Sequence, residues 1–157
     1  MAVSILPERP DSDDARALIL ELEGHLAQHY AAESRHGYSV DKLIAEGVAF
    51  FVLRQSVTPA GCGGIQLFGT EYGELKRMYV RPAFRGRGYG RLMLDHLANF
   101  ARSRGVGLLR LETGIHQAAA IALYERAGFR TVHVRARYYQ DDNEDALVMI
   151  AALAAAP

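Results

Sequence analysis

The stretch MYVRPAFRGRGYG, residues 78–90, joins a predicted strand to a predicted helix and carries the strongest structural signal in this 157-residue sequence. The helix begins near Tyr89. The start of a helix leaves about four backbone N–H groups unpaired, and the aligned peptide dipoles put partial positive charge there. Most helices carry acidic or hydroxyl side chains at this end. Here the first acidic residue is Asp95, and the preceding turn carries Arg85 and Arg87. The sequence therefore predicts that an external anion supplies the missing negative charge.

Three glycines make this loop suitable for a phosphate group. Because Gly86, Gly88 and Gly90 lack side chains, the backbone can approach an anion closely and adopt positive φ. Two common phosphate loops do not match. The P-loop needs Gly-Lys-Ser/Thr, which the sequence lacks, and the dinucleotide fingerprint needs G-x-G-x-x-G, whereas this loop reads G-x-G-x-G followed by Arg91. We predict a phosphate or pyrophosphate site of the form R-x-x-G-x-G.

Length and composition predict one globular domain over residues 1–157. Half of the residues are hydrophobic and 23% are charged, which excludes a disordered chain. No apolar run reaches the ~18 residues of a membrane span, and the N-terminus has no signal-peptide pattern. The single cysteine, Cys62, permits no internal disulfide and agrees with a reducing compartment. We expect a cytoplasmic protein that does not associate with membranes.

The charge is balanced over the whole chain but not along it. There are 18 basic and 18 acidic residues, and the local net charge is −4 over 1–70, +6 over 71–110 and −2 over 111–157. Sixteen of the basic residues are arginines, which suit bidentate contact with phosphate or carboxylate. Neutrality argues against a general nucleic-acid binder, and the basic middle segment indicates one local anion.

Hydrophobic periodicity predicts a mixed sheet with helices packed on it, an α/β (α+β) fold. Strands are expected at 2–6, 48–55, 63–69, 73–80, 107–113, 129–134 and 146–153, and helices at about 13–30, 41–46, 89–103 and 117–127. We expect a turn at 58–61 and a polar, turn-like segment at 135–145. Alternation along 73–80 predicts one face with Leu75, Arg77 and Tyr79 and an opposite face with Glu74, Lys76, Met78 and Val80.

Two segments resemble the GNAT superfamily of N-acetyltransferases. They are MYVRPAFRGRGYG (78–90), which has the form of the acetyl-coenzyme A pyrophosphate motif, and LETGIHQAAAIALYERAGF (111–129), which is similar to the strand and helix that follow it. The resemblance covers nearly the whole chain. It implies the GNAT fold, a mostly antiparallel twisted sheet of about six to seven strands flanked by about four helices.

The resemblance also implies where acetyl-coenzyme A binds. In this family the strand equivalent to 73–80 bulges and separates from its neighbour at 107–112, and the pantetheine arm lies in the gap. The amide of Met78 would polarise the thioester carbonyl. The implied cofactor-binding residues are Met78, Tyr79, Val80, Arg85, Gly86, Arg87, Gly88, Tyr89, Gly90 and Arg91.

Two residues are implied as catalytic. Tyr124 matches the family tyrosine that protonates the departing thiolate, although its helical spacing also suits a core tyrosine. Glu74 lies six residues before Val80, the spacing at which the histone acetyltransferase branch carries its catalytic glutamate. The alternative for Glu74 is an ion pair with Lys76 or Arg77 on the sheet surface.

The acceptor pocket is implied to include Glu74, His133 and Tyr138. The family often has Asn near 116–117, where it contacts the coenzyme arm. This sequence has His-Gln there and so departs from the family pattern. Of the histidines, His25 and His29 are four residues apart, a spacing that we interpret as a solvated helix face, and we predict no metal. Cys62 is expected to be a small strand residue.

The sequence thus predicts an acetyl-CoA-dependent N-acetyltransferase that acts by direct attack in a ternary complex. The expected acceptor is a primary amine of a small or amino-acid-like molecule. The alternatives are a protein N-terminal or lysine acetyltransferase and a non-catalytic acyl-CoA-binding regulatory module. No nucleic-acid partner is expected, and a homodimer is left open because family members are often dimers.

Overall fold

The computed structural model describes residues 2–27, 39–115, 117–139 and 144–154. For residues 26–27, 136–139 and 144 it describes the backbone alone. Its strands form one sheet of seven in the order β1-β2-β3-β4-β5-β7-β6. The strands are β1 (Val3–Pro7), β2 (Ala49–Gln55), β3 (Thr58–Phe68), β4 (Tyr72–Val80), β5 (Leu108–Gly114), β6 (Arg130–Tyr139) and β7 (Glu144–Ala152). The helices are α1 (Asp13–Ala27), α2 (Val40–Ala45), the 3₁₀ turn η2 (Pro82–Phe84), α3 (Tyr89–Ser103) and α4 (Ala118–Arg126).

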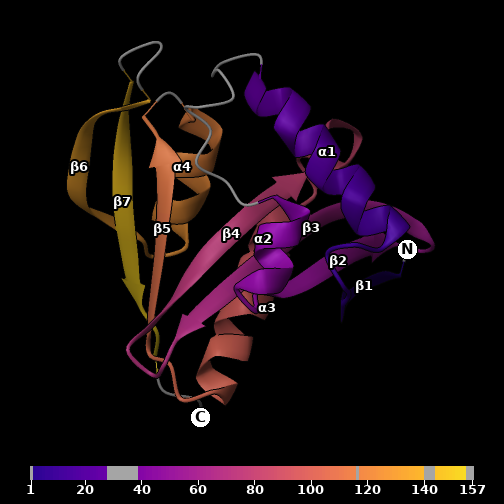
Figure 1. Cartoon of the computed structure of the whole chain (residues 1–157), viewed down its shortest axis with the longest axis horizontal. Helices are drawn as coiled ribbons and strands as arrows, with labels where there is room; N and C mark the ends of the chain where they lie inside the picture. The colour runs from indigo at the N-terminus through magenta and orange to yellow at the C-terminus, as the bar shows by residue number, and fades with distance from the viewer. Residues whose placement is uncertain (1, 28–38, 116, 140–143, 155–157) are drawn as a thin grey trace.

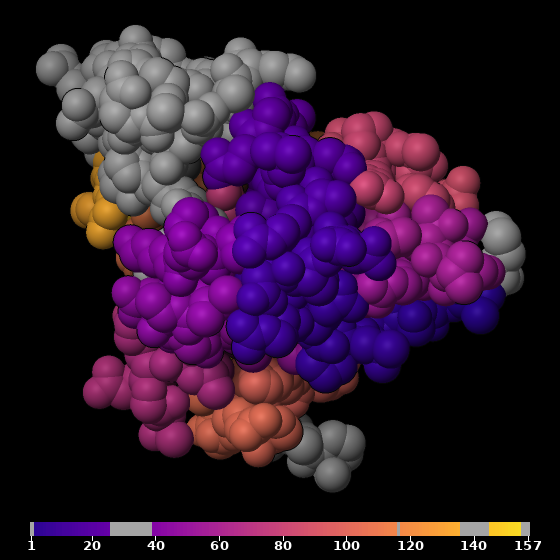
Figure 2. Space-filling model, turned by 45° about the vertical axis from the view of Figure 1, so that its right-hand side comes forward, coloured from indigo at the N-terminus to yellow at the C-terminus, as the bar shows by residue number. Residues whose placement is uncertain are grey.

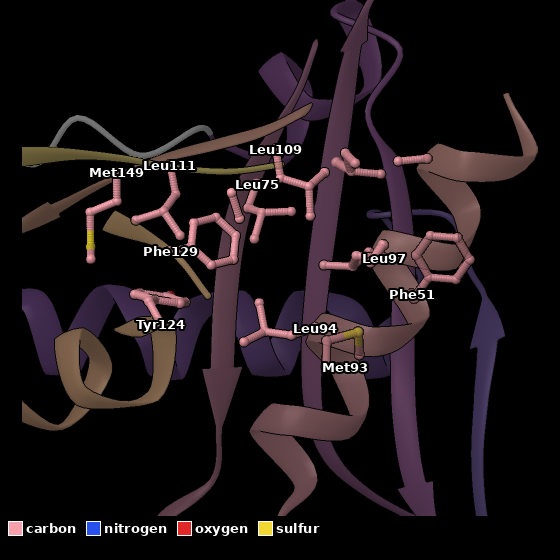
Figure 3. Packing of buried hydrophobic residues seen from close by; sticks show 14 of the residues in the cluster. Phe51, Leu75, Met93, Leu94, Leu97, Leu109, Leu111, Tyr124, Phe129 and Met149 are labelled. Carbon is pink, nitrogen blue, oxygen red and sulfur yellow. The ribbon is translucent and has the colours of Figure 1, made fainter. Parts of the chain in front are cut away.

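Helices cover both faces of the sheet, as Figure 1 shows. On one face, α1 and α2 pack on a buried cluster that includes Leu18, Leu43 and Val52. On the other, α3 and α4 pack on a larger cluster that includes Leu97 and Met149. Figure 3 shows side chains of this cluster between the sheet and the helices. Among the described strands the β4–β5 pair is parallel and the other pairs are antiparallel. The predicted fold class is confirmed.

Two of the predicted boundaries were wrong. The hairpin between β2 and β3 turns at Ser56 and Val57, because Gln55 already pairs with Thr58 and Ser56 takes φ +54°. A two-residue hairpin turn favours this left-handed backbone, so the segment predicted as a turn lies in β3 instead. In the same way β6 continues to Tyr139, because it pairs antiparallel with β7 through part of the segment predicted as polar turn.

A β-bulge interrupts β4 at Arg77. Cys62 pairs with Tyr79 and Gly64 pairs with Lys76, so two residues of β4 lie opposite the single Gly63 of β3, and Arg77 has φ +54°. A bulge of this kind bends the strand and reverses the direction of the following side chains.

The bulge corrects the predicted alternation of β4. Leu75 packs in the cluster under α3, as does Met78, whereas Tyr79 packs in the cluster under α1. Arg77 contacts Glu23 of α1 and so faces the α1 side. The prediction that Glu74 shares a face with Met78 was therefore wrong, because the extra residue at Arg77 shifts the period-two pattern by one position.

Beyond the first residues of β4, the parallel strands β4 and β5 separate. Their pairing joins Gly73 to Leu109 and Glu74 to Arg110, and no further pair is formed among the described residues. Figure 1 shows the two strands close together at one end and spread in a V at the other. The sheet is thereby open in its middle, at the level of the bulge.

We expect Gly61→Ala to destabilise the fold, because Gly61 lies where β3 meets the end of β4. An added Cβ would stand 2.6 Å from the carbonyl oxygen of Tyr79, a backbone atom that cannot rotate away. Overpacking of this kind costs ~1–3 kcal/mol of unfolding free energy. Urea denaturation of the variant measures the loss.

Gly24→Ala is the matched control, since no heavy atom lies within 4 Å of a Cβ at this exposed position in α1. The control should gain up to ~1 kcal/mol from helix propensity. Equal urea midpoints for Gly61→Ala and the unsubstituted chain would contradict the described β3–β4 packing.

Candidate active site

The opening between β4 and β5 holds a cavity of about 730 Å³, which we call the cleft. Its walls come from six parts of the chain: β4, β5, the loop after β4, the first turn of α3, α4 and the C-terminal half of α1. Of the sequence-predicted residues, the cleft brings together Glu74, Met78, Tyr79, Val80, Arg85, Gly86, Gly88, Tyr89, Gly90, Arg91 and Tyr124. Residues 46 positions apart in sequence, such as Met78 and Tyr124, therefore line one space.

The arginine-glycine loop presents a row of backbone amides. Gly86 and Gly88 both have φ +79°, and Gly88 is the N-cap of α3 with no side-chain hydrogen bond and no acidic residue in the first turn. Within the described part of the chain, the amides of residues 86–91 donate no hydrogen bond. Since these N–H groups lie at the positive end of α3, the loop is suited to bind an anion.

Gly90 has a packing role in addition. A Cβ at this position would stand 2.9 Å from Cδ2 of Leu123 in α4, whereas the same addition at Gly86 or Gly88 meets no atom within 4 Å. Gly90 thus allows α3 and α4 to approach closely, and it is the positive φ at Gly86 and Gly88 that requires glycine there.

The arginines of the loop point in different directions. Arg85 lines the cleft, donates to the carbonyl of Val80 at 3.0 Å and lies over the Tyr79 ring. Arg87 instead donates to Oε1 of Gln55 at 2.6 Å, and its side chain does not line the cleft. Of the three predicted arginine contacts, the structure thus places Arg85 and Arg91 at the cleft and Arg87 on the end of β2.

Tyr124 lies in the cleft wall with little exposure to solvent. It belongs to the apolar cluster under α3 and α4, and its ring centroid lies 5.7 Å from that of Phe129. Figure 3 shows the two rings next to each other. Burial raises the pKa of Tyr124 to about 12, because the apolar surroundings disfavour the phenolate. The hydroxyl therefore stays protonated at neutral pH.

Glu74 belongs to a row of alternating charges that crosses β4, β5 and β6. Its Oε1 is 2.6 Å from Nζ of Lys76, and its Oε2 contacts Arg110. Arg110 also bonds Oε1 of Glu112 at 2.8 Å, and Arg135 lies 3.5 Å from that oxygen. These five side chains, here called the charged strip, lie on the face of the sheet that carries α1.

A second ion pair lies beside the strip. Arg77 contacts Glu23 of α1, and only 3% of the Arg77 side chain is exposed against 34% for Glu23. Burial lowers the pKa of Arg77 to about 10, so the guanidinium remains charged at neutral pH. Behind it the thiol of Cys62 donates to the carbonyl of Arg77 at 3.3 Å, and burial raises the pKa of this thiol. Cys62 is thus the small, inert strand residue that we expected.

The predicted acceptor residues lie at the edge of the described site. His133 is exposed on β6 and pairs through Val148 with Glu112, which puts it on the same face as the charged strip but outside the cleft wall. The side chain of Tyr138 lies outside the described residues, as do residue 116 and His29.

Several polar residues that line the cleft were not assigned to the site from the sequence, among them Glu112, Thr113 and Arg126. Glu112 is two residues after Arg110 on one strand face, and its alternation with Leu111 was the signal that could have indicated it. Arg126, at the end of α4, adds a cation near Arg91, whose guanidinium donates to the Arg126 carbonyl at 3.3 Å.

Within the described ranges, no group of three or more His, Cys, Asp or Glu side chains is arranged to hold a metal ion. In the same ranges no helix combines the length and apolar character that crossing a bilayer would require.

The chain belongs to the Acetyltransferase (GNAT) family, whose sequence pattern matches residues 14–129. Among characterised relatives, it is 43% identical over 129 residues to an IAA acetyltransferase of Azospirillum brasilense, which covers 81% of this chain and 84% of that protein. It is also 46% identical over 72 residues to a ribosomal protein bS18-alanine N-acetyltransferase of Salmonella typhimurium, 45% of this chain and 49% of that protein. The predicted family and class of enzyme, an acetyltransferase, are confirmed.

Solved structures share the whole fold. A putative acyl-CoA N-acyltransferase of Klebsiella pneumoniae aligns with a TM-score of 0.78 at 33% identity over 97% of this chain and 98% of that chain. The ribosomal-protein-S18-alanine N-acetyltransferase of Escherichia coli aligns with a TM-score of 0.74 at 28% identity over 99% and 97%. A GNAT acetyltransferase of Elizabethkingia anophelis, solved with acetyl-CoA bound, has a TM-score of 0.78 at 18% identity over 96% and 98%, a likeness of fold.

Proposed function

We propose that this protein is an acetyl-CoA-dependent N-acetyltransferase that acetylates a primary amine of a small or amino-acid-like molecule by direct attack in a ternary complex. One observation carries the proposal: the row of amides at residues 86–91 opens on the same cleft as the buried hydroxyl of Tyr124. The first feature suits a pyrophosphate and the second suits a proton donor, and the family that the chain belongs to transfers acetyl groups.

The cleft fits acetyl-coenzyme A in charge and in size. The amides of 86–91 and the guanidinium of Arg85 would hold the pyrophosphate. The separated edges of β4 and β5 would receive the pantetheine arm, with backbone partners at Met78 and Val80 and the ring of Tyr79 alongside. A volume of about 730 Å³ is in the usual range for a cofactor site. When bound, the coenzyme supplies the acetyl group as an activated thioester.

Tyr124 would give the proton that the departing sulfur needs. Because its pKa is raised to about 12, the residue holds this proton over the whole neutral range. The amide of Met78, next to the bulge, would donate to the carbonyl oxygen as charge develops there. Both groups stand on backbone fixed by the cluster under α3 and α4.

Two carboxylates of the charged strip could take a proton from the amine. In Glu74, which the resemblance indicates, each oxygen already contacts a cation. In Glu112, the contacts from Arg110 and Arg135 both reach Oε1. The geometry therefore favours Glu112 as the base, with Glu74 positioning it through their shared partner Arg110.

A second candidate function is acetylation of a protein N-terminus. It is favoured by the local identity to the ribosomal alanine N-acetyltransferase, 46% over 72 residues. A non-catalytic acyl-CoA-binding module would bind its ligand with the same loop, and Tyr124 would then have no catalytic role. For location we propose the cytoplasm, since the lone buried thiol of Cys62 suits a reducing compartment.

Acetyl-CoA binding with arginine variants tests the proposed cofactor site. Calorimetric titration of the whole chain should give saturable binding, and Arg85→Ala should raise Kd by about tenfold because a charge-assisted contact is lost. Arg87→Ala is the matched control, expected within about twofold since its guanidinium bonds Gln55. Absence of binding to the unsubstituted chain, or equal losses in both variants, would contradict the site.

Replacement of Tyr124 by Phe tests the proton donor. Release of free coenzyme A thiol in the presence of an amine panel should fall by about 10²–10⁴ in kcat, with little change in acetyl-CoA affinity. The tyrosine stays protonated below its raised pKa of about 12, so the fold loss should be constant from about pH 6 to 10. A rate equal to that of the unsubstituted chain would make Tyr124 a core residue. Binding without turnover of any amine would favour the non-catalytic module.

Glutamine variants of the two carboxylates separate base from positioning residue. Glu112→Gln should lower kcat/KM by about 10²-fold or more. Glu74→Gln should lower kcat/KM less. The reverse order of effects would return the role of base to Glu74.

A further inference from the structure

We propose that Lys76 and Arg77 form a carboxylate-binding subsite in the acceptor end of the cleft, so that the acceptor is an amino acid with a free carboxylate next to its amine. This inference rests on the proposed function and narrows its substrate class. The acceptor end is the part of the cleft lined by α1 and by residues 74–77 of β4.

The bulge brings the two cations together. Consecutive residues of a regular strand point to opposite faces. At φ +54° the backbone of Arg77 breaks this rule, so that Lys76 pairs with Glu74 and Arg77 pairs with Glu23 on the same, α1-bearing face. Two adjacent positive side chains on one face make a site that a single carboxylate can bridge.

Arg77 already binds a carboxylate in this structure. The partner is Glu23, which reaches in from α1 with 34% of its side chain exposed, whereas Arg77 is 3% exposed. Glu23 is thus the more exposed partner of the pair, and an incoming carboxylate would compete with it for the buried guanidinium. A planar guanidinium in a buried position is the usual protein group for bidentate carboxylate recognition. An acceptor carboxylate would take the place of Glu23.

Negatively charged side chains lie beside this subsite. Glu74 and Glu112 line the same cleft and lie on the same face as Lys76. An ammonium group would be drawn to them, and a carboxylate one carbon away would be drawn to Lys76 and Arg77. The acceptor end therefore complements a compound that carries both charges, and a diamine would place a second cation against the two basic side chains.

Paired acceptors test the subsite directly. A panel of L-amino acids is assayed with the whole chain and acetyl-CoA by release of free coenzyme A thiol. Each amino acid is compared with its amide, in which a carboxamide replaces the carboxylate. The amino acids should exceed their amides in kcat/KM by about tenfold or more, since the amide removes the charge that the subsite binds. Equal values for acid and amide would overturn the subsite while the proposed function stands. Turnover of neither, despite acetyl-CoA binding, would overturn the subsite, and turnover of no member of the amine panel would overturn the proposed function as well.

Three variants test whether Lys76 and Arg77 cause the preference for amino acids over their amides. Lys76→Gln and Arg77→Gln should each bring the acid-to-amide ratio towards one, and Glu23→Gln should increase it because the internal competitor loses its charge. Arg54→Gln is the matched control: it removes another partly buried arginine with two carboxylate partners, Glu8 and Asp14, and should keep the ratio. Thermal unfolding checks that each variant is folded, and if Arg77→Gln is not, Lys76→Gln and Glu23→Gln decide. An unchanged ratio in both of these would overturn the assignment.

Discussion

The left-handed backbone at Arg77 is the local feature on which the site depends. Non-glycine residues in this conformation cost ~1–3 kcal/mol, so the surrounding contacts must compensate. Here the carbonyl of Arg77 accepts from Cys62 and its guanidinium is held by Glu23. The bulge bends β4 away from β5, which opens the cleft, and it also turns Met78 towards the α3 side and Arg77 towards α1. Under the proposed function, the coenzyme arm and the acceptor would meet at this one distortion of β4.

The anion loop was predictable from sequence because its properties are local. Positive φ at Gly86 and Gly88, the missing acidic cap and the start of α3 at Tyr89 all follow from residues within one turn of each other. Periodicity likewise predicted the strands and helices, since burial on one face imposes a period of two or 3.6. The errors at the β2–β3 turn and in β6 arose because pairing with a neighbouring strand determined the boundary.

The remaining parts of the site depend on partners that are distant in sequence. Alternation within β4 could not indicate the bulge, because the extra residue is visible only against the register of β3. The choice between base and ion pair for Glu74 depended on Arg110, 36 positions away, and the different orientations of Arg85 and Arg87 depended on Gln55. Such contacts are set by the packed sheet rather than by local pattern.

The two faces of the sheet divide the chemistry between them. On the α3 and α4 face the surroundings are apolar, and the same desolvation that raises the pKa of Tyr124 to about 12 keeps its proton in place. On the other face, which Figure 2 shows largely under α1 (indigo), the charged strip holds ionised groups whose partners offset their burial. Neither environment could both keep a tyrosine protonated and hold ionised groups. A charge is costly among apolar side chains, and a tyrosine among cations loses its proton more easily. The cleft joins the two environments, so the proposed proton donor and the proposed acceptor-binding groups would act on one bond from opposite sides.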